Sequence, residues 1–412
     1  MLRHVDVAAK SLEPYRAVAG AEVVAELERL AAPLRGARIL QINATAYGGG
    51  VSVLLRSLVP LYRGLGLTVD WRVMPGTPEF FTVTKGLHNA LQGASFDLTE
   101  ERRGLYLDHN REVAEALRRQ DHYDVVIVHD PQPAAVRHFL GGDDTRWVWR
   151  CHIDTSHPDP AAIRFLEPLV AEYDALVYTM EEFLPADLRD RPVRIITPAI
   201  DPLSPKNLPL PDDLVRGILA WTGISLDRPL VSQISRFDPW KDPLGVVEVY
   251  RRVREQVPGT QLALVGQMAL DDPQGWEILR QIQQESVDDD DIHVLTNFTG
   301  IDDVGVNAFQ RASSVVLQKS IREGFGLVVS ESLWKGTPVV AGRTGGIPLQ
   351  MPDGVGGYLI ESTEECVART VELLRDRATA ERLGTSGRRH VHDHFLITRL
   401  LADELRLLDS LV

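Results

Sequence analysis

Two carboxylates flank a glycine turn late in this chain. Glu323 precedes the Gly-Phe-Gly turn and Glu331 follows it, within a helical pattern that stops near Pro338. An apolar run at 312–317 predicts a buried strand that ends at Glu323. A strand, a glycine turn and a helix N-terminus form an anion site, because the first amides of a helix lack intrahelical partners. Two acids beside such a site indicate a ligand with phosphate and hydroxyl groups, such as a nucleotide sugar.

A basic pair follows another predicted strand, at 230–234. Arg236 and Lys241 lie in the loop after this strand, and open α/β sheets bind ligands at the carboxyl ends of their strands. Arginine offers a planar fork and lysine a point charge, and together they can offset the charge of a diphosphate leaving group. A solvated surface loop is the alternative interpretation, and the position after a strand favours the functional one.

Two other clusters are interpreted as structural. His390, His392 and His394 alternate along a segment that we expect to join helices. Alternation does not place three side chains on one helical face, so no metal site is predicted. The acidic run at 288–291 is interpreted as a solvated loop.

The elements that position these residues alternate between strand and helix. Short apolar strands are predicted at 37–42, 67–72, 125–128, 146–150, 175–178 and 193–196, and again at 230–234, 262–265, 292–295, 315–317 and 339–341. This alternation indicates two doubly wound, Rossmann-like α/β units with ligands at the carboxyl ends of both sheets. The proline-rich segment 197–205 is the expected linker and hinge. We expect one domain at 1–203, completed by a helix at 395–412, and a second at 204–394.

Bulk properties narrow the class of protein. The 412 residues favour two domains, and 44% hydrophobic with 25% charged residues is typical of a soluble globular protein. A formal net charge of −14 argues against nucleic acid or an anionic membrane as the main partner. Two distant cysteines, Cys151 and Cys366, form no disulfide framework. With no apolar run near the ~18 residues that span a bilayer, and no signal-peptide pattern, we expect a cytoplasmic enzyme.

The motifs also carry a family resemblance. Glu323 to Glu331 resembles the E-x7-E signature of retaining GT-B glycosyltransferases of the family 4 type, and 335–340, 345–346 and 309–313 continue it. Within that group the chain looks most like the trehalose glycosyltransferring synthases. The closer match rests on four N-terminal segments, at 45–51, 79–93, 129–134 and 149–154. Retaining trehalose phosphorylases share much of this pattern.

The resemblance implies a GT-B fold, with two Rossmann-like domains facing a central cleft, and a donor site in the second domain. Arg236 and Lys241 would hold the donor diphosphate. Glu331 would hold the ribose and Glu323 the transferred glucose. Backbone amides would bind phosphate along the loop of Gly324, Phe325, Gly326 and Leu327.

The same resemblance places the remaining roles in the first domain. His152 would lie beneath the transferred glucose, near its C6 hydroxyl. The glycine loop at 48–50, with Gly49 and Gly50, would close over donor and acceptor. Four polar residues are candidates for acceptor contacts, namely Asp130, Asp154, Lys85 and Asn89. For Lys85 and Asn89, capping and lining a helix is an equally good interpretation.

The resulting hypothesis is reversible transfer of glucose, with retention, from a nucleoside-diphosphate glucose to glucose, giving trehalose. Retention by double displacement needs a carboxylate opposite the leaving group, and no residue is an obvious candidate, so front-face attack is preferred. No cofactor or metal is expected to be required, and stimulation by Mg²⁺ stays open. Partners are expected to be small molecules, and a homodimer is the commonest closed assembly. The alternatives are a phosphorylase, a synthase of another α-glucoside such as glucosylglycerate, and a non-enzymatic sugar-nucleotide sensor.

Overall fold

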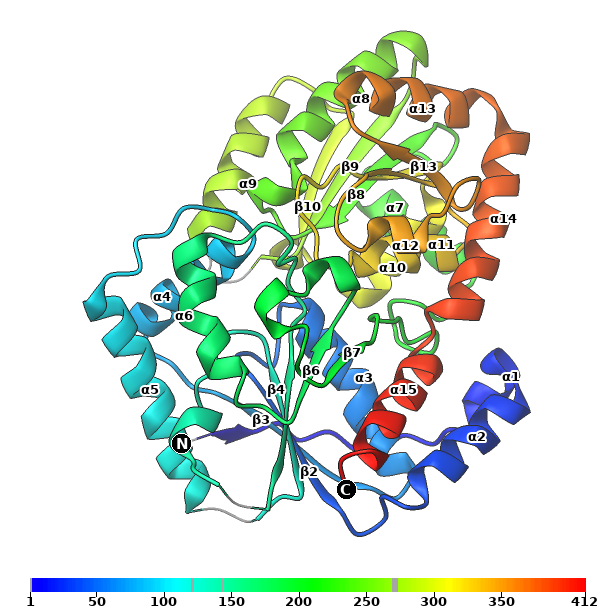
Figure 1. The fold of residues 1–412 in the computed structure, drawn as a ribbon. Coiled ribbons are helices and arrows are strands. Elements are labelled where there is room, and N and C mark those ends of the chain that lie inside the picture. Colours follow the sequence, from blue (N-terminus) through cyan, green and yellow to red (C-terminus); the bar gives the residue numbers. More distant parts are fainter. Residues whose placement is uncertain (1, 120–121, 143, 269–272) are drawn as a thin grey trace. The chain divides into compact units, whose positions relative to one another are not determined.

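The chain forms two compact units (Figure 1). The structure, a computed structural model, describes residues 2–119, 122–142, 144–268 and 273–412. One unit holds residues 1–199 and 397–412, and the other holds 200–396. The boundaries expected from the sequence, 203/204 and 394/395, lie a few residues from these.

The first unit is built on a sheet that, in the described residues, has seven strands in the order β1-β3-β2-β4-β5-β6-β7. All pairings are parallel except that of β1 with β3. The strands are β1 (Arg3–His4), β2 (Arg38–Asn43), β3 (Thr68–Val73), β4 (Val125–His129), β5 (Arg146–Arg150), β6 (Ala175–Tyr178) and β7 (Val193–Ile195). Every residue of β4 is buried, as expected for a central parallel strand covered on both faces.

Helices cover both faces of this sheet. Figure 1 shows α4, α5 and α6 on one side and α2, α3 and α15 on the other. The helices are α1 (Arg16–Ala19), α2 (Ala21–Ala31), α3 (Gly50–Gly64), α4 (Pro78–Leu91), α5 (Glu100–Arg118), α6 (Pro160–Val170) and α15 (Ile397–Asp409). The last helix therefore belongs to the first unit, although the whole second unit separates it in sequence.

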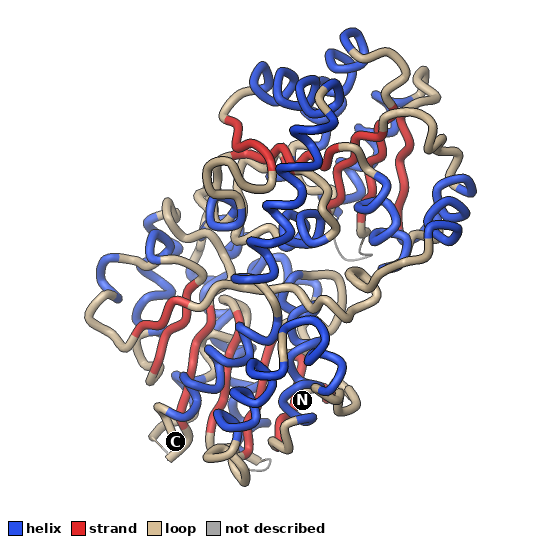
Figure 2. Tube along the Cα trace, turned by 90° about the vertical axis from the view of Figure 1, so that its right-hand side faces the viewer, coloured by secondary structure: helices blue, strands red, loops and turns tan. Residues whose placement is uncertain are grey.

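The second unit repeats the plan with a parallel sheet ordered β10-β9-β8-β11-β12-β13. Its strands are β8 (Leu230–Ser235), β9 (Gln261–Gly266), β10 (Ile292–Thr296), β11 (Val315–Gln318), β12 (Val339–Gly342) and β13 (Gly357–Ile360). Its helices are α7 (Asp212–Trp221), α8 (Pro243–Gln256), α9 (Pro273–Ser286), α10 (Asp303–Ala312), α11 (Leu327–Trp334), α12 (Ile347–Gln350), α13 (Thr363–Arg375) and α14 (Arg377–His394). Figure 2 shows the strands of each unit as one set with helices around it.

Each sheet has one place where the strand order reverses. In the first unit the chain lays β3 on one side of β2 and β4 on the other. In the second it lays β9 on one side of β8 and β11 on the other. Loops that leave such neighbouring strands in opposite directions open a crevice at their carboxyl ends. The switch points therefore single out the residues that follow β2, β4, β8 and β11.

The structure differs from the sequence expectations in four places. Strands β1 and β13 were not expected, because β1 has two residues and β13 begins at Gly357, the second of two paired glycines. The strand expected from residue 312 begins at Val315, since Ala312 ends α10. Glu323 lies in the turn beyond the end of β11, not at the strand end. His390, His392 and His394 lie within α14, which continues to His394, and not in a segment between helices.

The expected linker is ordered. Ile200 forms an isolated parallel bridge with Leu396, and its backbone N–H donates to Phe395 O at 2.9 Å. The two chain crossings between the units are therefore hydrogen-bonded to each other. Asn207, just beyond, donates its side-chain amide to Asp201 O at 3.0 Å. In the described part of the chain, no helix is both long and apolar enough to cross a bilayer.

Candidate active site

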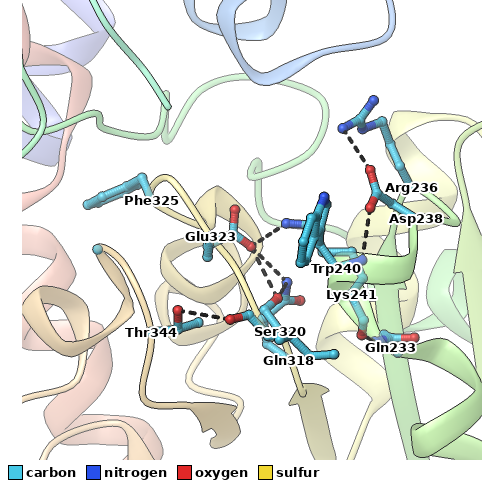
Figure 3. Close-up of polar contacts among 12 residues, drawn as sticks. Gln233, Arg236, Asp238, Trp240, Lys241, Gln318, Ser320, Glu323, Phe325 and Thr344 are labelled. Carbon is cyan, nitrogen blue, oxygen red and sulfur yellow. Dashed lines mark hydrogen bonds and ion pairs between the residues drawn. The ribbon is translucent and has the colours of Figure 1, made fainter. Parts of the chain in front are cut away.

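Lys241 and Glu323 form an ion pair at the carboxyl edge of the second sheet (Figure 3). Lys241 Nζ lies 2.5 Å from Glu323 Oε2, and both side chains are largely buried. Lys241 follows β8 and Glu323 follows β11, the two strands at the switch point of this sheet. The fold therefore joins two residues that the sequence predicts separately.

The carboxylate of Glu323 is held by one of its oxygens. Oε2 accepts hydrogen bonds from Lys241 Nζ, from Gln318 Nε2 at 3.2 Å and from Ser320 Oγ at 3.3 Å. Among the described residues no hydrogen bond goes to Oε1, and Figure 3 shows one oxygen of Glu323 pointing away from the three donors. The carboxylate is thus fixed in orientation with one oxygen left to accept from a ligand.

Backbone hydrogen bonds hold the two loops together. Ile321 N donates to Trp240 O at 2.8 Å, which ties the loop after β11 to the loop after β8. Gln233, on β8, donates its Nε2 to Lys241 O at 2.7 Å. Asp238 Oδ1 accepts from Trp240 N at 2.9 Å and caps the short helix that ends at Lys241. Lys241 is therefore carried by a rigid turn and not by a free loop.

The N-terminus of α11 offers amides to an anion. Val329 N donates to Gly326 O at 2.9 Å, and Ser330 N donates to Gln350 Oε1 at 2.9 Å. Of the first four amides of this helix, those of 327–328 have no such partner in the described residues. They lie directly beyond the turn that carries Glu323, as an anion site requires.

Glycines allow the close packing around this turn. Gly326 has φ +82°, and a Cβ there would lie 3.2 Å from Glu323 Cγ. Gly345 has φ +52°, and a Cβ there would lie 1.6 Å from Glu323 O. Gly346 N donates to Gly324 O at 3.1 Å. The loop 344–346 therefore supports the Glu323 turn from behind, and a side chain at Gly345 cannot be accommodated without moving it.

Phe325 anchors the turn through its side chain. The ring is buried, with its centroid 5.5 Å from that of Phe395. Its carbonyl oxygen accepts from Gln350 Nε2 at 2.5 Å. Any contact of Phe325 with a donor phosphate would thus come from its backbone, as expected for this loop.

Arg236 is not part of the Lys241–Glu323 pair. Its Nη2 lies 3.4 Å from Asp238 Oδ2, and its side chain is 41% exposed. In Figure 3 its guanidinium lies apart from Glu323 and next to the carboxylate of Asp238. Of the two predicted cations, Arg236 is therefore the more accessible and Lys241 the more buried.

Glu331 is buried within α11. Its Oε2 accepts from Gln310 Nε2 at 3.1 Å. Lys335, one turn later, donates its Nζ to Asn207 Oδ1 at 2.6 Å and to Glu331 O at 3.0 Å. Burial lowers the pKa of Lys335 to about 7, although the Glu331 carboxylate opposes this shift. The environment of Glu331 is therefore a polar cluster rather than open solvent.

In the first unit, Asp130 and His152 meet at the carboxyl edge of the sheet. Asp130 has a left-handed backbone, with φ 64°, and its Oδ1 accepts from His152 N at 2.8 Å. Burial raises the pKa of Asp130 to about 7, against the opposing effects of this hydrogen bond and of Arg150. The aspartate is thus a structural partner of His152 as well as a candidate for ligand contacts.

His152 is linked to two residues that the sequence reasoning missed. His152 Nε2 lies 2.9 Å from His129 Nδ1, and His129 Nε2 lies 2.7 Å from Gln41 Oε1. Burial, and then the charge of Arg150, hold the pKa of both histidines well below the usual range, so both rings are neutral near pH 7. Gln41 lies inside a strand pattern that is otherwise apolar, and this is the signal that could have identified it.

The glycine loop begins α3 after β2. Gly49 N donates to Ser52 Oγ at 3.2 Å, and Ser52 Oγ donates to Gly49 O at 2.8 Å. Gly50 is the first residue of the helix. Gly48 has φ +80°, a conformation that favours glycine, and no atom lies within 4 Å of a Cβ built on Gly48 or Gly49. The loop surface is therefore open on that side.

The other acceptor candidates are Asp154 and two residues of α4. Asp154 is buried and its Oδ1 accepts from Ser156 N at 3.0 Å and Ser156 Oγ at 2.6 Å, which closes a local turn. Lys85 and Asn89 lie one turn apart on α4, half-buried. Because its carboxylate closes its own turn, Asp154 has a local structural role.

The fold defines the class of protein. A sucrose-phosphate synthase from Thermosynechococcus elongatus superposes with a TM-score of 0.72 at 19% identity, covering 91% of this chain and 99% of that chain. The two doubly wound sheets of the present chain are those of the GT-B glycosyltransferases. The expected fold class is thereby confirmed.

Sequence comparison places the chain within that class. Residues 41–185 match a family described as trehalose synthase, N-terminal domain, and residues 220–390 match glycosyl transferases group 1. A trehalose synthase from Rubrobacter xylanophilus is 51% identical over the full length of both chains. One from Thermococcus litoralis is 43% identical over 97% of each. The chain belongs to the trehalose synthase family and is a hexosyltransferase, which confirms the resemblance seen in its motifs.

Proposed function

We propose that this hexosyltransferase makes trehalose from a nucleoside-diphosphate glucose and free glucose, reversibly and with retention at the transferred anomeric carbon. The names of its relatives support trehalose as the product. The observation that carries the donor assignment is the Lys241–Glu323 pair next to the free amides of α11. It offers a cation and backbone donors for a diphosphate beside a carboxylate oxygen for a sugar hydroxyl.

The proposed chemistry takes place on one face of the donor sugar. The bond between C1 and the phosphate oxygen breaks as the acceptor hydroxyl oxygen forms its bond to C1 on the same face. The acceptor's proton moves to the departing phosphate oxygen, which leaves as nucleoside diphosphate. Lys241, Arg236 and the N-terminus of α11 would stabilise the charge that develops there.

The setting of Glu323 supports a binding role over a nucleophilic one. Three donors hold its Oε2, two of them the neutral groups of Gln318 and Ser320. Such donors stabilise the charge and reduce the reactivity of the carboxylate. We therefore assign Glu323 to hydroxyl groups of the transferred glucose, and Glu331 to the ribose.

Product analysis tests the proposal. The protein is incubated with glucose and each of a panel of nucleoside-diphosphate glucoses, and the product is identified by NMR from the couplings at both anomeric centres. Trehalose with release of nucleoside diphosphate is the expected result. Parallel incubations of trehalose with phosphate and with nucleoside diphosphate complete the test. Glucose 1-phosphate from the phosphate incubation alone would identify a phosphorylase instead.

The proposal includes no obligatory cofactor. Because Lys241, Arg236 and backbone amides supply the positive groups for the diphosphate, turnover is expected to persist in excess chelator. Added Mg²⁺ is expected to stimulate at most. Complete loss of turnover in chelator, restored by Mg²⁺, would contradict this part.

A further inference from the structure

Three side chains form a continuous hydrogen-bonded row at the switch point of the first sheet. Gln41 lies on β2, His129 ends β4 and His152 follows β5, and these strands are neighbours in the order β2-β4-β5. The contacts run from Gln41 Oε1 to His129 Nε2 at 2.7 Å and from His129 Nδ1 to His152 Nε2 at 2.9 Å. Gln41 and His129 are fully buried, and His152 is half-buried.

The protons along this row are determined by its first member. A neutral imidazole has one N–H donor and one acceptor nitrogen. The carbonyl oxygen of Gln41 can only accept, so His129 carries its proton on Nε2 and accepts on Nδ1. His152 must then donate from Nε2, which leaves its Nδ1 unprotonated. In the described chain this Nδ1 makes no hydrogen bond, so it is the atom that remains for a ligand.

A buried glutamine at position 41 destabilises the folded state unless one of its hydrogen bonds has a function. Its Nε2 is buried without a hydrogen-bond partner among the described residues. A buried polar group without a hydrogen-bond partner destabilises the folded state, and an apolar residue would be the ordinary choice on a central parallel strand. The retained contact is the one from Oε1 to His129.

We propose that Gln41, acting through His129, is a positioning residue that fixes the tautomer of His152, so that Nδ1 of His152 accepts a hydrogen bond from a hydroxyl group of the sugar substrate. The role of His152 as a sugar contact rests on the function proposed above. The tautomer itself does not, because it is a property of the protein without substrate.

Imidazole ¹⁵N shifts test the tautomer directly, since they separate protonated from unprotonated ring nitrogens. The full-length protein is labelled with ¹⁵N-histidine, and the signals are assigned by their loss in His152→Gln and His129→Asn. In the wild type, Nδ1 of His152 is expected to be unprotonated and Nε2 protonated. The opposite pattern would overturn the proposal, and this result requires no variant at Gln41.

Gln41→Met then tests the control by Gln41. Without its acceptor, the buried N–H of His129 has no partner, and a buried unpaired donor is strongly disfavoured. The protons of both rings are therefore expected to shift, with His152 gaining Nδ1–H. Gln261→Met is the matched control, because Gln261 is a buried glutamine on β9 whose amide bonds only Ser225 backbone atoms in the described chain. Identical histidine shifts in wild type and Gln41→Met would refute the relay.

Steady-state kinetics test the consequence. For Gln41→Met, kcat/KM for the nucleoside-diphosphate glucose is expected to fall about 10-fold, the size of one lost hydrogen bond. Binding of the nucleoside diphosphate alone should not change, since it brings no sugar hydroxyl. Gln261→Met should retain both values. Changed histidine shifts with unchanged kcat/KM would refute the substrate contact, and absence of turnover in the wild type would instead refute the proposed function.

Discussion

At the scale of single residues, Lys241 has two tasks. Its ammonium group pairs with Glu323 at 2.5 Å, and in the proposed reaction it also faces the diphosphate. A single lysine can do both, because its three N–H donors need not point to one acceptor. The pair thus compensates the charges of a buried cation and a buried carboxylate.

Lys241→Ala is the direct test of that residue. We expect kcat to fall by ~10²–10³, as for the loss of one contact to a developing negative charge. Arg377→Ala is the control, because Arg377 pairs with Glu381 at the surface of α14 and should leave kcat unchanged. Near-normal turnover of a correctly folded Lys241→Ala protein would contradict the assignment of Lys241 to the diphosphate.

The raised pKa of Asp130 predicts that the stability of the fold depends on pH. Its pKa is raised to about 7 in the fold, against ~3.9 in an unfolded chain. Between these values the folded state keeps a proton that the unfolded state has lost, so this group makes stability fall as the pH rises from ~4 to ~7. Asp130→Asn keeps the side-chain oxygen that accepts from His152 N and removes the titration.

Urea denaturation across that range measures the effect. The free energy of unfolding of Asp130→Asn should gain on that of the wild type as the pH rises from ~4 to ~7, by at most ~1.4 kcal/mol per pH unit. Above pH ~7 the difference should be constant. A difference that does not change with pH would show that Asp130 is ionised throughout.

From their spacing alone, charged residues of the candidate site were easier to single out than the buried neutral residues Gln41 and His129. Lys241 and Glu323 stand out because each follows an apolar strand and carries a charge. Gln41 and His129 belong to strands whose pattern is apolar, and a hydrogen bond between neighbouring strands leaves no trace in the spacing of one sequence. The contact of Lys241 with Glu323 was equally invisible, because strand order brings them together.

At the scale of elements, the loop after β12 supports the turn that carries Glu323. Gly345→Ala places a methyl group 1.6 Å from Glu323 O as the backbone stands, so the Glu323 turn must move. We expect a loss of at least 10-fold in kcat/KM, since small displacements of a group at the reacting centre slow the reaction.

Gly354→Ala is the matched control: its φ is +78°, with no atom within 4 Å of the new Cβ. It should cost ~1 kcal/mol of stability and no activity. Equal kinetics for the two variants would contradict the support role of Gly345.

Helix α15 joins the first unit through a buried ion pair. Arg150 Nη1 contacts Glu404 Oε1, and Tyr62 OH donates to Glu404 Oε2 at 2.6 Å. Glu404→Ala leaves the Arg150 charge buried and unpaired, which should cost ~3–5 kcal/mol of unfolding free energy. Glu26→Ala, which breaks the surface pair with Arg406, should cost less than ~1 kcal/mol. The double variant Arg150→Met with Glu404→Leu should recover part of the lost free energy of unfolding. If its loss equals the sum of the losses of Arg150→Met and Glu404→Leu measured separately, the two residues do not stabilise the fold as a pair.

The sequence predicts the central strands best. The bounds expected for β5 and β6 match the structure, because a buried parallel strand is a continuous apolar run with clear ends. Two of the four edge strands escape this logic, whereas the edge strands β7 and β10 were expected to within one residue of their ends. β1 has two exposed residues, and β13 begins at Gly357, so their pairing depends on the neighbours β3 and β12 and not on their own composition.

At the scale of the whole molecule, two copies of one plan carry different chemistry. The switch point between β2 and β4 holds neutral rings and an amide, suited to hydroxyl groups. The switch point between β8 and β11 holds cations and free amides, suited to phosphate. In a chain with net charge −14, phosphate binding depends on that local cluster, since the overall field opposes an anionic ligand.

The difference between the two switch points predicts which unit binds a nucleoside diphosphate. A nucleoside diphosphate binding to the native state should slow amide hydrogen exchange at 327–330 and 236–242 in the second unit. The amides of β2 and β4 should be unchanged when no sugar is present, because every residue assigned to the diphosphate belongs to the second unit. The nucleoside monophosphate, which lacks the second phosphate, is the control and should protect 327–330 less. Equal protection by both nucleotides, or protection concentrated in the first unit, would show that the diphosphate site lies elsewhere.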